Sequence, residues 1–295
     1  NLDAVASAMR RYGLLGVDVF FPLSGFLITR YLIETTTSQE IKVFFQRRFF
    51  RIVPLYLTAV TVFLAISLVL GAEAENADRV WITYLFLTGW FIFFDGSANV
   101  PYTITWSLSV EEFAYILFGI LAWISRRNLM IFLVVISCAS LALRFYLNID
   151  ETGGVYNFPP ARLDSIAIGG ITAILLERRI RGLFVILTAG ALASYLLALM
   201  VPTLWSTLKY TFIAFGTCAL IVLFETRLKG WQTRALSGFA SIGFHSYFTY
   251  LFHLFNIHLV MELWAFLRPD TLAPFWGVVV AALVVTQIQA VLSFK

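Results

Sequence analysis

The sequence predicts an all-α fold, a bundle of helices that crosses a membrane several times. Hydrophobic residues make up 60% of the 295 residues, charged residues make up 13%, and the mean hydropathy is +0.85. A soluble domain is about half apolar and about a quarter charged, so lipid has to cover part of this surface. The apolar runs are long and unbroken, whereas the strands of a membrane barrel alternate apolar and polar residues.

We expect nine spanning helices, because a spanning helix needs about 20 mostly apolar residues. They lie at residues 13–32, 49–71, 106–124, 129–148, 162–178, 183–200, 207–224, 244–266 and 274–294. No linker between them is long enough to separate two domains, so residues 1–295 should form a single membrane-embedded domain. A further apolar run at 81–94 is followed at once by Asp95, Gly96 and Pro101, so we expect it to enter the membrane without crossing it.

The basic residues are distributed unevenly between the two sides of this predicted bundle. Fourteen of the 21 lysines and arginines fall on one side, whereas the opposite loops between helices contain only Arg79 and Arg268. An excess of basic residues marks the cytoplasmic side of a membrane protein, which gives the orientation. Residues 1–12 then form an outer loop, and the odd number of crossings leaves the two ends of the chain on opposite faces.

Several kinds of site find no support in the sequence. Cys138 and Cys218 lie inside apolar runs, where cysteine is typical of packing rather than of a disulfide or a metal site. The three histidines lack the tight spacing of a metal site, so we expect no metal. Neither a P-loop nor a dinucleotide-binding glycine pattern occurs, and the basic patches are too short and too scattered to predict nucleic acid as a partner.

Two adjacent glutamates enter an apolar helix in the stretch TWSLSVEEFAY, residues 105–115. At helical spacing Ser107 and Glu111 share one face with Tyr115, while Glu112 points about 100° away. An ionisable group inside a membrane is costly and is therefore a functional candidate. We select Ser107 and Glu111 as catalytic candidates, with Glu111 orienting a catalytic base or a sugar hydroxyl. The alternative is a carboxylate at a helix start, stabilised by the helix dipole and by interfacial water.

A single acidic residue, Asp18, interrupts the apolar run GLLGVDVFFPLSGFLIT at residues 13–29. Pro22 and Gly25 would loosen the helix near it. We include Asp18 among the catalytic candidates. The alternative is an aspartate that lies at the outer interface of the membrane.

Three arginines, Arg47, Arg48 and Arg51, lie among phenylalanines in KVFFQRRFFRIVPLY, residues 42–56. Basic residues among aromatic ones suit a helix at the membrane interface, where they would anchor the topology. The alternative is a cytoplasmic site for a phosphorylated ligand, to which each arginine can donate two parallel hydrogen bonds.

Polar residues open the predicted helix in ARLDSIAIGG, residues 161–170. Arg162 and Ser165 share a face of this helix, and Asp164 lies between them in sequence. Arg162 and Ser165 can cap the helix, which we slightly favour. Alternatively, Arg162 and Asp164 bind an acceptor molecule from the outer side.

A polar stripe occurs in SYFTYLFHLFNIH, residues 246–258, where Thr249, His253 and Asn256 fall on one helix face. A lone histidine in a helix bundle is often a structural group with satisfied hydrogen bonds. The stripe makes His253 a catalytic candidate as well.

These stretches, in this order, resemble the acyltransferase 3 family of integral membrane acyltransferases, and the resemblance covers nearly the whole chain. The family's W-S-L-x-x-E element falls on Trp106, Ser107, Leu108 and Glu111, and its R-R-x-x-R-I-x-P element falls on Arg47, Arg48, Arg51, Ile52 and Pro54. Its G-V-D-x-F-F-x-x-S-G element falls on Gly16, Val17, Asp18, Phe20, Phe21, Ser24 and Gly25. Its S-Y-x-x-Y-L-x-H element falls on Ser246, Tyr247, Tyr250, Leu251 and His253.

The resemblance implies an enzyme of the bacterial inner membrane with about ten spanning helices. Such enzymes move an acetyl or other acyl group from cytoplasmic acyl-CoA to a hydroxyl, often on a sugar of a surface polysaccharide or lipopolysaccharide. By this resemblance Arg47, Arg48 and Arg51 would bind acyl-CoA as the donor substrate, and no bound cofactor would be needed. The other partners would be the lipid bilayer and a glycan or glycolipid acceptor.

The family's first helix carries an arginine and, about ten residues further on, a histidine that acts as the catalytic base. No such pattern precedes Gly13, so we expect one helix to be missing before Asn1 and this fragment to be inactive. Glu111 would orient the absent histidine or the acceptor. Two alternatives remain: a transporter or flippase of a lipid-linked sugar, for which we find no internal repeat, and a catalytically inactive paralogue.

Overall fold

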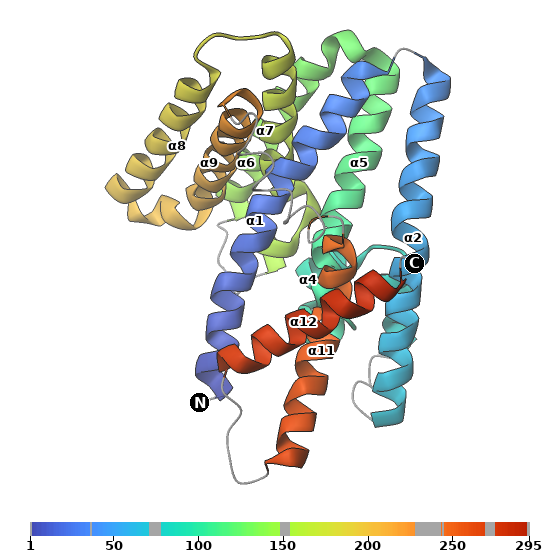
Figure 1. The fold of residues 1–295 in the computed structure, drawn as a ribbon. Coiled ribbons are helices and arrows are strands. Elements are labelled where there is room, and N and C mark those ends of the chain that lie inside the picture. The colour runs from blue at the N-terminus through green and yellow to red at the C-terminus, as the bar shows by residue number, and fades with distance from the viewer. Residues whose placement is uncertain are drawn as a thin grey trace.

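The computed structural model describes residues 2–35, 37–70, 78–147, 154–227, 243, 245–268 and 275–293. Throughout these ranges the regular elements are helices and no strand occurs, which confirms the predicted all-α fold (Figure 1). The long helices are α1 (Leu2–Glu34), α2 (Ser38–Leu70), α5 (Trp106–Ser125), α6 (Leu129–Leu147), α7 (Pro159–Glu177), α8 (Leu183–Met200), α9 (Trp205–Arg227), α11 (Ser246–Leu267) and α12 (Phe275–Ser293). The short ones are α3 (Val80–Tyr84), α4 (Thr88–Asp95), η2 (Ser97–Asn99), η3 (Thr103–Thr105), η4 (Arg126–Asn128), η5 (Gly154–Asn157) and η6 (Pro202–Leu204).

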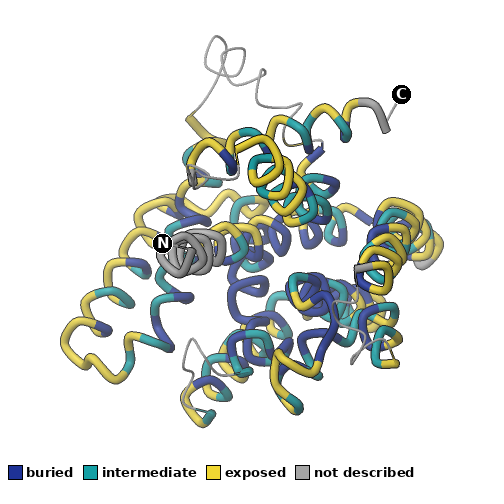
Figure 2. Tube along the Cα trace, turned by 90° about the horizontal axis from the view of Figure 1, so that it is seen from below, coloured by how far each residue is buried: buried dark blue, intermediate teal, exposed yellow. Residues whose placement is uncertain are grey.

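Each of the nine predicted spans falls on one of the long helices. Within the described residues, six stretches are long and apolar enough to cross a membrane, and one of them, Thr103–Leu147, contains both α5 and α6. α7 and the apolar part of α12, Trp276–Val291, are not among the six, so crossing by these two helices stays a prediction. Figure 2 shows exposed turns at the periphery and buried turns toward the middle of the bundle, as expected of helices that face lipid.

Residues 2–12, predicted as an outer loop, are instead helical and form the beginning of α1. The prediction of a loop was wrong, because it rested on the charge pattern, which does not report on secondary structure. The segment contains three alanines, the residue with the highest helix propensity, and neither glycine nor proline occurs in it before Gly13.

The apolar run at 81–94 forms two short helices. This agrees with the prediction that the run does not cross the membrane. α3 ends at Tyr84 and α4 begins at Thr88, and between them Phe86 adopts a left-handed conformation with φ of 58°. The 8 residues of α4 measure about 12 Å, far less than the ~30 Å of a bilayer's hydrocarbon core. Neither helix is therefore long enough to cross.

α1 and α7 pack with their backbones in direct contact. A methyl group added at Gly25 would overlap the carbonyl oxygen of Ile166, and one added at Gly169 would overlap the carbonyl oxygen of Pro22. Small residues allow this close approach, which is a common way of joining helices inside a membrane. The contact fixes α1 against the most buried helix of the bundle.

Two buried ion pairs lie where α1, α6, α7 and α9 meet. Arg162 donates a hydrogen bond to Asp18, and Arg144 donates to both carboxylate oxygens of Asp164, with Nη1 2.7 Å from Oδ1. Neither arginine side chain has any exposed area. Such pairs tie the helices together, because removing one partner leaves a buried charge uncompensated.

The prediction that Arg162 and Ser165 cap α7 was wrong. Phe158 precedes the helix and Pro159 opens it, while the Arg162 side chain turns toward Asp18 on α1. Tyr156 of η5 also donates a hydrogen bond to Asp18, at 3.4 Å. Burial raises the pKa of the Tyr156 phenol, so this group keeps its proton and remains a donor. A charged partner on another helix, which the local sequence does not reveal, decides the position of Arg162.

Candidate active site

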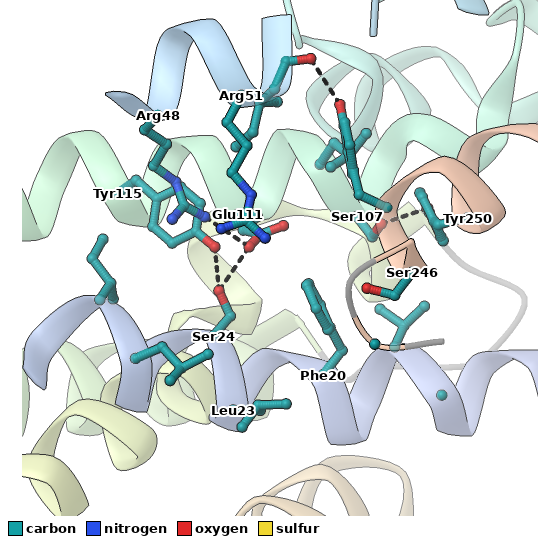
Figure 3. Close-up of a pocket in the computed structure, with 18 of the residues that line it drawn as sticks. Phe20, Leu23, Ser24, Arg48, Arg51, Ser107, Glu111, Tyr115, Ser246 and Tyr250 are labelled. Carbon is teal, nitrogen blue, oxygen red and sulfur yellow. Dashed lines mark hydrogen bonds and ion pairs between the residues drawn. The ribbon is translucent and has the colours of Figure 1, made fainter. Parts of the chain in front are cut away.

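A cavity of about 890 Å³ lies between α1, α2, α5 and α11. Its wall on α1 runs from Gly16 to Tyr31, which corresponds to about 22 Å along the helix axis. The cavity therefore extends along most of the ~30 Å depth of a bilayer's hydrocarbon core. Its polar lining residues are Ser24, Tyr31, Arg47, Arg48, Arg51, Ser107, Glu111, Tyr115, Ser246, Tyr247, Tyr250 and His253. Most of them are labelled in Figure 3.

Glu111 is the acidic residue in the lining of this cavity, and its side chain is only 6% exposed. Its Oε1 atom accepts a hydrogen bond from Ser24 Oγ at 2.7 Å and one from Arg48 Nη2 at 3.1 Å. Because the Ser24 proton goes to the carboxylate, the Tyr115 hydroxyl is the donor in its own hydrogen bond with Ser24. Three helices thus hold the carboxylate in one orientation, and Oε2 remains for a ligand.

The three arginines lie in two different environments. Arg48 is half-buried, pairs with Glu111, and places its guanidinium carbon 3.0 Å from the centre of the Tyr115 ring. Arg47 and Arg51 are exposed and line the cavity, and Figure 3 shows Arg51 reaching over Glu111. Arg48 is therefore engaged in positioning the carboxylate, and Arg47 and Arg51 are the arginines available to an anionic ligand.

Ser107 lies at the other end of the view in Figure 3, against Tyr250 of α11, with a distance of 2.5 Å between their hydroxyl oxygens. The Tyr250 hydroxyl donates its proton to the carbonyl oxygen of Ile104. It follows that Ser107 donates to Tyr250, so the Ser107 proton is already engaged. Ser107 and Glu111 both line the cavity, as their predicted shared helix face requires.

The residues of the predicted polar stripe on α11 have two different roles. Thr249 accepts a hydrogen bond from Gln287 of α12 at 2.6 Å, and Asn256 donates to Thr286 and Gln289 of α12. These bonds join the two helices, as polar side chains often do in membranes. His253 instead lines the cavity, with Nδ1 2.8 Å from the carbonyl oxygen of Tyr250. A carbonyl only accepts, so Nδ1 carries a proton, and in the neutral form of the ring Nε2 keeps a lone pair.

The chain matches the model of a family described as "Acyltransferase domain" (Acyl_transf_3) over residues 5–292. The chain belongs to this acyltransferase family. It is therefore an integral membrane protein built as a helical bundle, in agreement with the apolar helices. No solved structure matches this acyltransferase.

Among known proteins, this acyltransferase is similar to O-acetyltransferase OatA of Staphylococcus aureus, with 31% identity over 181 residues that cover 55% of this chain and 30% of that protein. It is 30% identical to peptidoglycan O-acetyltransferase OatA of Listeria monocytogenes over 140 residues, which cover 42% of this chain and 22% of that protein. An uncharacterized protein of Haemophilus influenzae is 26% identical over 180 residues, which cover 54% of this chain and 74% of that protein. The match thus spans less than a third of the length of either OatA protein.

Three predicted site residues of this acyltransferase do not line the cavity. Asp18, Arg162 and Asp164 are at most 4% exposed and are engaged in the two buried ion pairs described above. The structure therefore brings Glu111, Ser107, His253 and the three arginines to one cavity but leaves these charged residues outside it.

Sequence reasoning had given Ser24 no role of its own. Ser24 lies one residue before Gly25, where α1 contacts α7. The sequence around it does not indicate that Ser24 binds a polar partner. Tyr115 was predicted to share a helix face with Glu111 but was not selected as a site residue. Within the described ranges, no group of three metal-binding side chains occurs.

Proposed function

We propose that this acyltransferase moves an acyl group, most simply acetyl, from acyl-CoA to a hydroxyl of a glycan. The observation that carries this proposal is a cavity that combines exposed arginines with a buried, oriented carboxylate. The family supports acyl transfer as the reaction. The name of the Listeria monocytogenes relative, peptidoglycan O-acetyltransferase, supports a glycan such as peptidoglycan as the acceptor.

The donor end of the cavity contains Arg47 and Arg51. Acyl-CoA carries several phosphate groups, and guanidinium groups bind phosphate with paired, charge-assisted hydrogen bonds. The excess of basic residues on one side of the bundle supports a cytoplasmic position for these arginines. We propose that the protein lies in the inner membrane of a bacterium and that the donor arrives from the cytoplasm.

The reaction exchanges one ester for another. The acceptor oxygen forms a bond to the thioester carbonyl carbon, the carbon–sulfur bond breaks, and the hydroxyl proton ends on the released CoA thiol. Glu111 would accept a hydrogen bond through Oε2 and so orient the reacting group, as a carboxylate does in other acyl-transfer sites. Ser24 and Arg48 would keep this carboxylate from rotating, since both bind Oε1.

The adjacent glutamates provide a matched test. Glu111→Gln removes the charge in the cavity, whereas Glu112→Gln makes the same change one residue further on, at a side chain that does not line this cavity. We expect Glu111→Gln to lower acetyl transfer from labelled acetyl-CoA to the cell's glycan by about a hundredfold or more, as loss of a preorganised polar group does elsewhere. Glu112→Gln should retain most of the activity at equal protein level.

Two results would contradict the proposal. One is normal transfer by Glu111→Gln, which would remove this carboxylate from the reaction. The other is the absence of any acetyl-CoA-dependent change in the glycan when the full-length wild-type protein is present. A flippase of a lipid-linked sugar would give that second result, because it moves its substrate without acyl-CoA.

A further inference from the structure

A second, smaller cavity of about 280 Å³ lies between α11 and α12. Its lining consists of Ser246, Thr249, Tyr250, His253, Leu283 and Gln287. Ser246, Tyr250 and His253 also line the large cavity, and they follow one another at i, i+4 and i+7 along one face of α11. The two cavities therefore meet along this stripe of α11.

The two cavities differ in the charge of their linings. The large cavity contains three arginines and Glu111, whereas the residues that line the small cavity include no Arg, Lys, Asp or Glu. The surface of the small cavity is mostly apolar carbon, with the imidazole of His253 and the amide of Gln287 among its lining groups. Apolar carbon with a few neutral hydrogen-bonding groups matches one sugar ring, which presents C–H faces and hydroxyl groups. Such a lining matches the phosphates of acyl-CoA poorly.

The hydrogen-bond directions in the small cavity also fit an incoming hydroxyl group. His253 Nδ1 donates to the Tyr250 carbonyl oxygen, which leaves Nε2 as an acceptor. Gln287 donates through Nε2 to Thr249 Oγ1 at 2.6 Å, which leaves its carbonyl oxygen as a second acceptor. A sugar hydroxyl can donate to either atom.

We propose that the small cavity is the acceptor subsite of this acyltransferase and holds one sugar unit of a glycan. Its volume lies near the lower limit of small-molecule sites, about 300–1,000 Å³, so it suits one ring rather than several. A hydroxyl of this sugar next to the reacting one donates a hydrogen bond to His253 Nε2 at the stripe where the small cavity meets the large one, so that the reacting hydroxyl faces the large cavity and Glu111. The donor thioester then lies on the large-cavity side of the same stripe. This inference rests on the proposed function.

Leu283 allows the small cavity to be filled without touching the large one. It lines only the small cavity and is 44% exposed, so a tryptophan at this position has room and should not disturb the fold. Val284, its neighbour on α12, is 52% exposed and lines neither cavity. Val284→Trp is therefore the matched control, and Leu283→Met is the conservative variant at the test position.

The experiment uses the full-length protein in membranes, with labelled acetyl-CoA as donor. The acceptor is glycan purified from cells in which the gene is deleted, because such glycan lacks the modification. We expect Leu283→Trp to raise the apparent KM for the glycan at least tenfold and to leave the KM for acetyl-CoA unchanged. Leu283→Met and Val284→Trp should both resemble the wild type in all constants.

The possible outcomes separate the two proposals. An unchanged glycan KM in Leu283→Trp would overturn the acceptor subsite while leaving acyl transfer in place. A fall in kcat with no selective change in the glycan KM would also overturn it, because that pattern indicates a structural defect. If the wild type transfers no label to this glycan, the proposed function fails, and the subsite fails with it.

Discussion

Ser24 Oγ donates a hydrogen bond to Glu111 Oε1 over 2.7 Å and so joins α1 to α5 across 87 residues of sequence. The same serine accepts a hydrogen bond from the Tyr115 hydroxyl, one helical turn beyond Glu111. Ser24, Glu111 and Tyr115 are each at most 5% exposed. Through this hydrogen bond from Ser24, the position of α1 helps to determine the orientation of the Glu111 carboxylate.

Ser24→Ala should lower the rate of acyl transfer by about tenfold to a hundredfold, because a hydrogen bond to a charged group contributes roughly 1.5–3 kcal/mol. The measurement is labelled acetyl transfer at saturating acetyl-CoA, normalised to protein level. Ser194→Ala is the control, since Ser194 makes a hydrogen bond to Gly190 on α8 and lines neither cavity. Equal rates in the two variants would show that the orientation of Glu111 does not depend on Ser24.

Arg51→Ala should raise the KM for acetyl-CoA by about tenfold, because an exposed guanidinium in the cavity would bind donor phosphate. Added salt should weaken donor binding in the wild type more than in the variant, since salt screens exposed charges. Arg127→Ala removes an exposed arginine outside both cavities and serves as the control. A KM that stays at the wild-type value would assign Arg51 to anchoring the helix in the membrane instead.

Asp18→Asn should destabilise the protein by about 3–5 kcal/mol, because it leaves Arg162 buried without its charged partner. Thermal unfolding of the detergent-solubilised protein measures the effect. Glu225→Gln breaks the exposed pair with Arg30, whose nitrogen and oxygen lie 3.0 Å apart, and should cost less than about 1 kcal/mol.

The double variant Asp18→Leu with Arg162→Leu tests the same pair for a catalytic role. Replacing both charges by apolar groups removes the uncompensated charge, so stability should recover at least in part. Transfer activity should recover with it. Recovered stability without recovered activity would return Asp18 to the catalytic candidates.

Gly169→Ala should lower the unfolding temperature markedly, because the added methyl group meets the backbone of Pro22 and not a movable side chain. Overpacking of this kind costs about 1–3 kcal/mol or more. Gly216→Ala on α9 is the control, since an added methyl group there meets no atom within 4 Å. Equal unfolding temperatures would mean that α1 can move away from α7.

Helical periodicity predicted the parts of the site that lie on a single helix. Ser107, Glu111 and Tyr115 were expected on one face of α5, and all three line the cavity. The 3.6-residue repeat is local, so sequence spacing is sufficient for such a relationship.

The partners of buried charges could not be predicted in the same way. Arg162 and Asp164 were recognised as polar residues inside an apolar helix, but the sequence does not say that Asp18 and Arg144 face them. Arg144 lies in a run that was predicted as an ordinary span, although its side chain is fully buried. Such pairings depend on how distant helices pack, and no local pattern encodes that packing.

The close packing of α1 on α7 at Gly25 and Gly169 also bears on how the cavity can admit a substrate as large as acyl-CoA. α1 cannot recede, because its backbone already rests on α7. α2 and α11 form the opposite side and are held together by side-chain packing around Tyr56, Val60 and Leu251 and by hydrogen bonds such as those from Tyr247 to Ile52 and from Tyr250 to Ile104 of η3. The cavity thus has one wall held by backbone contact and one held by side chains, and we expect donors of different bulk to be accommodated by side-chain rearrangement on α2 and α11.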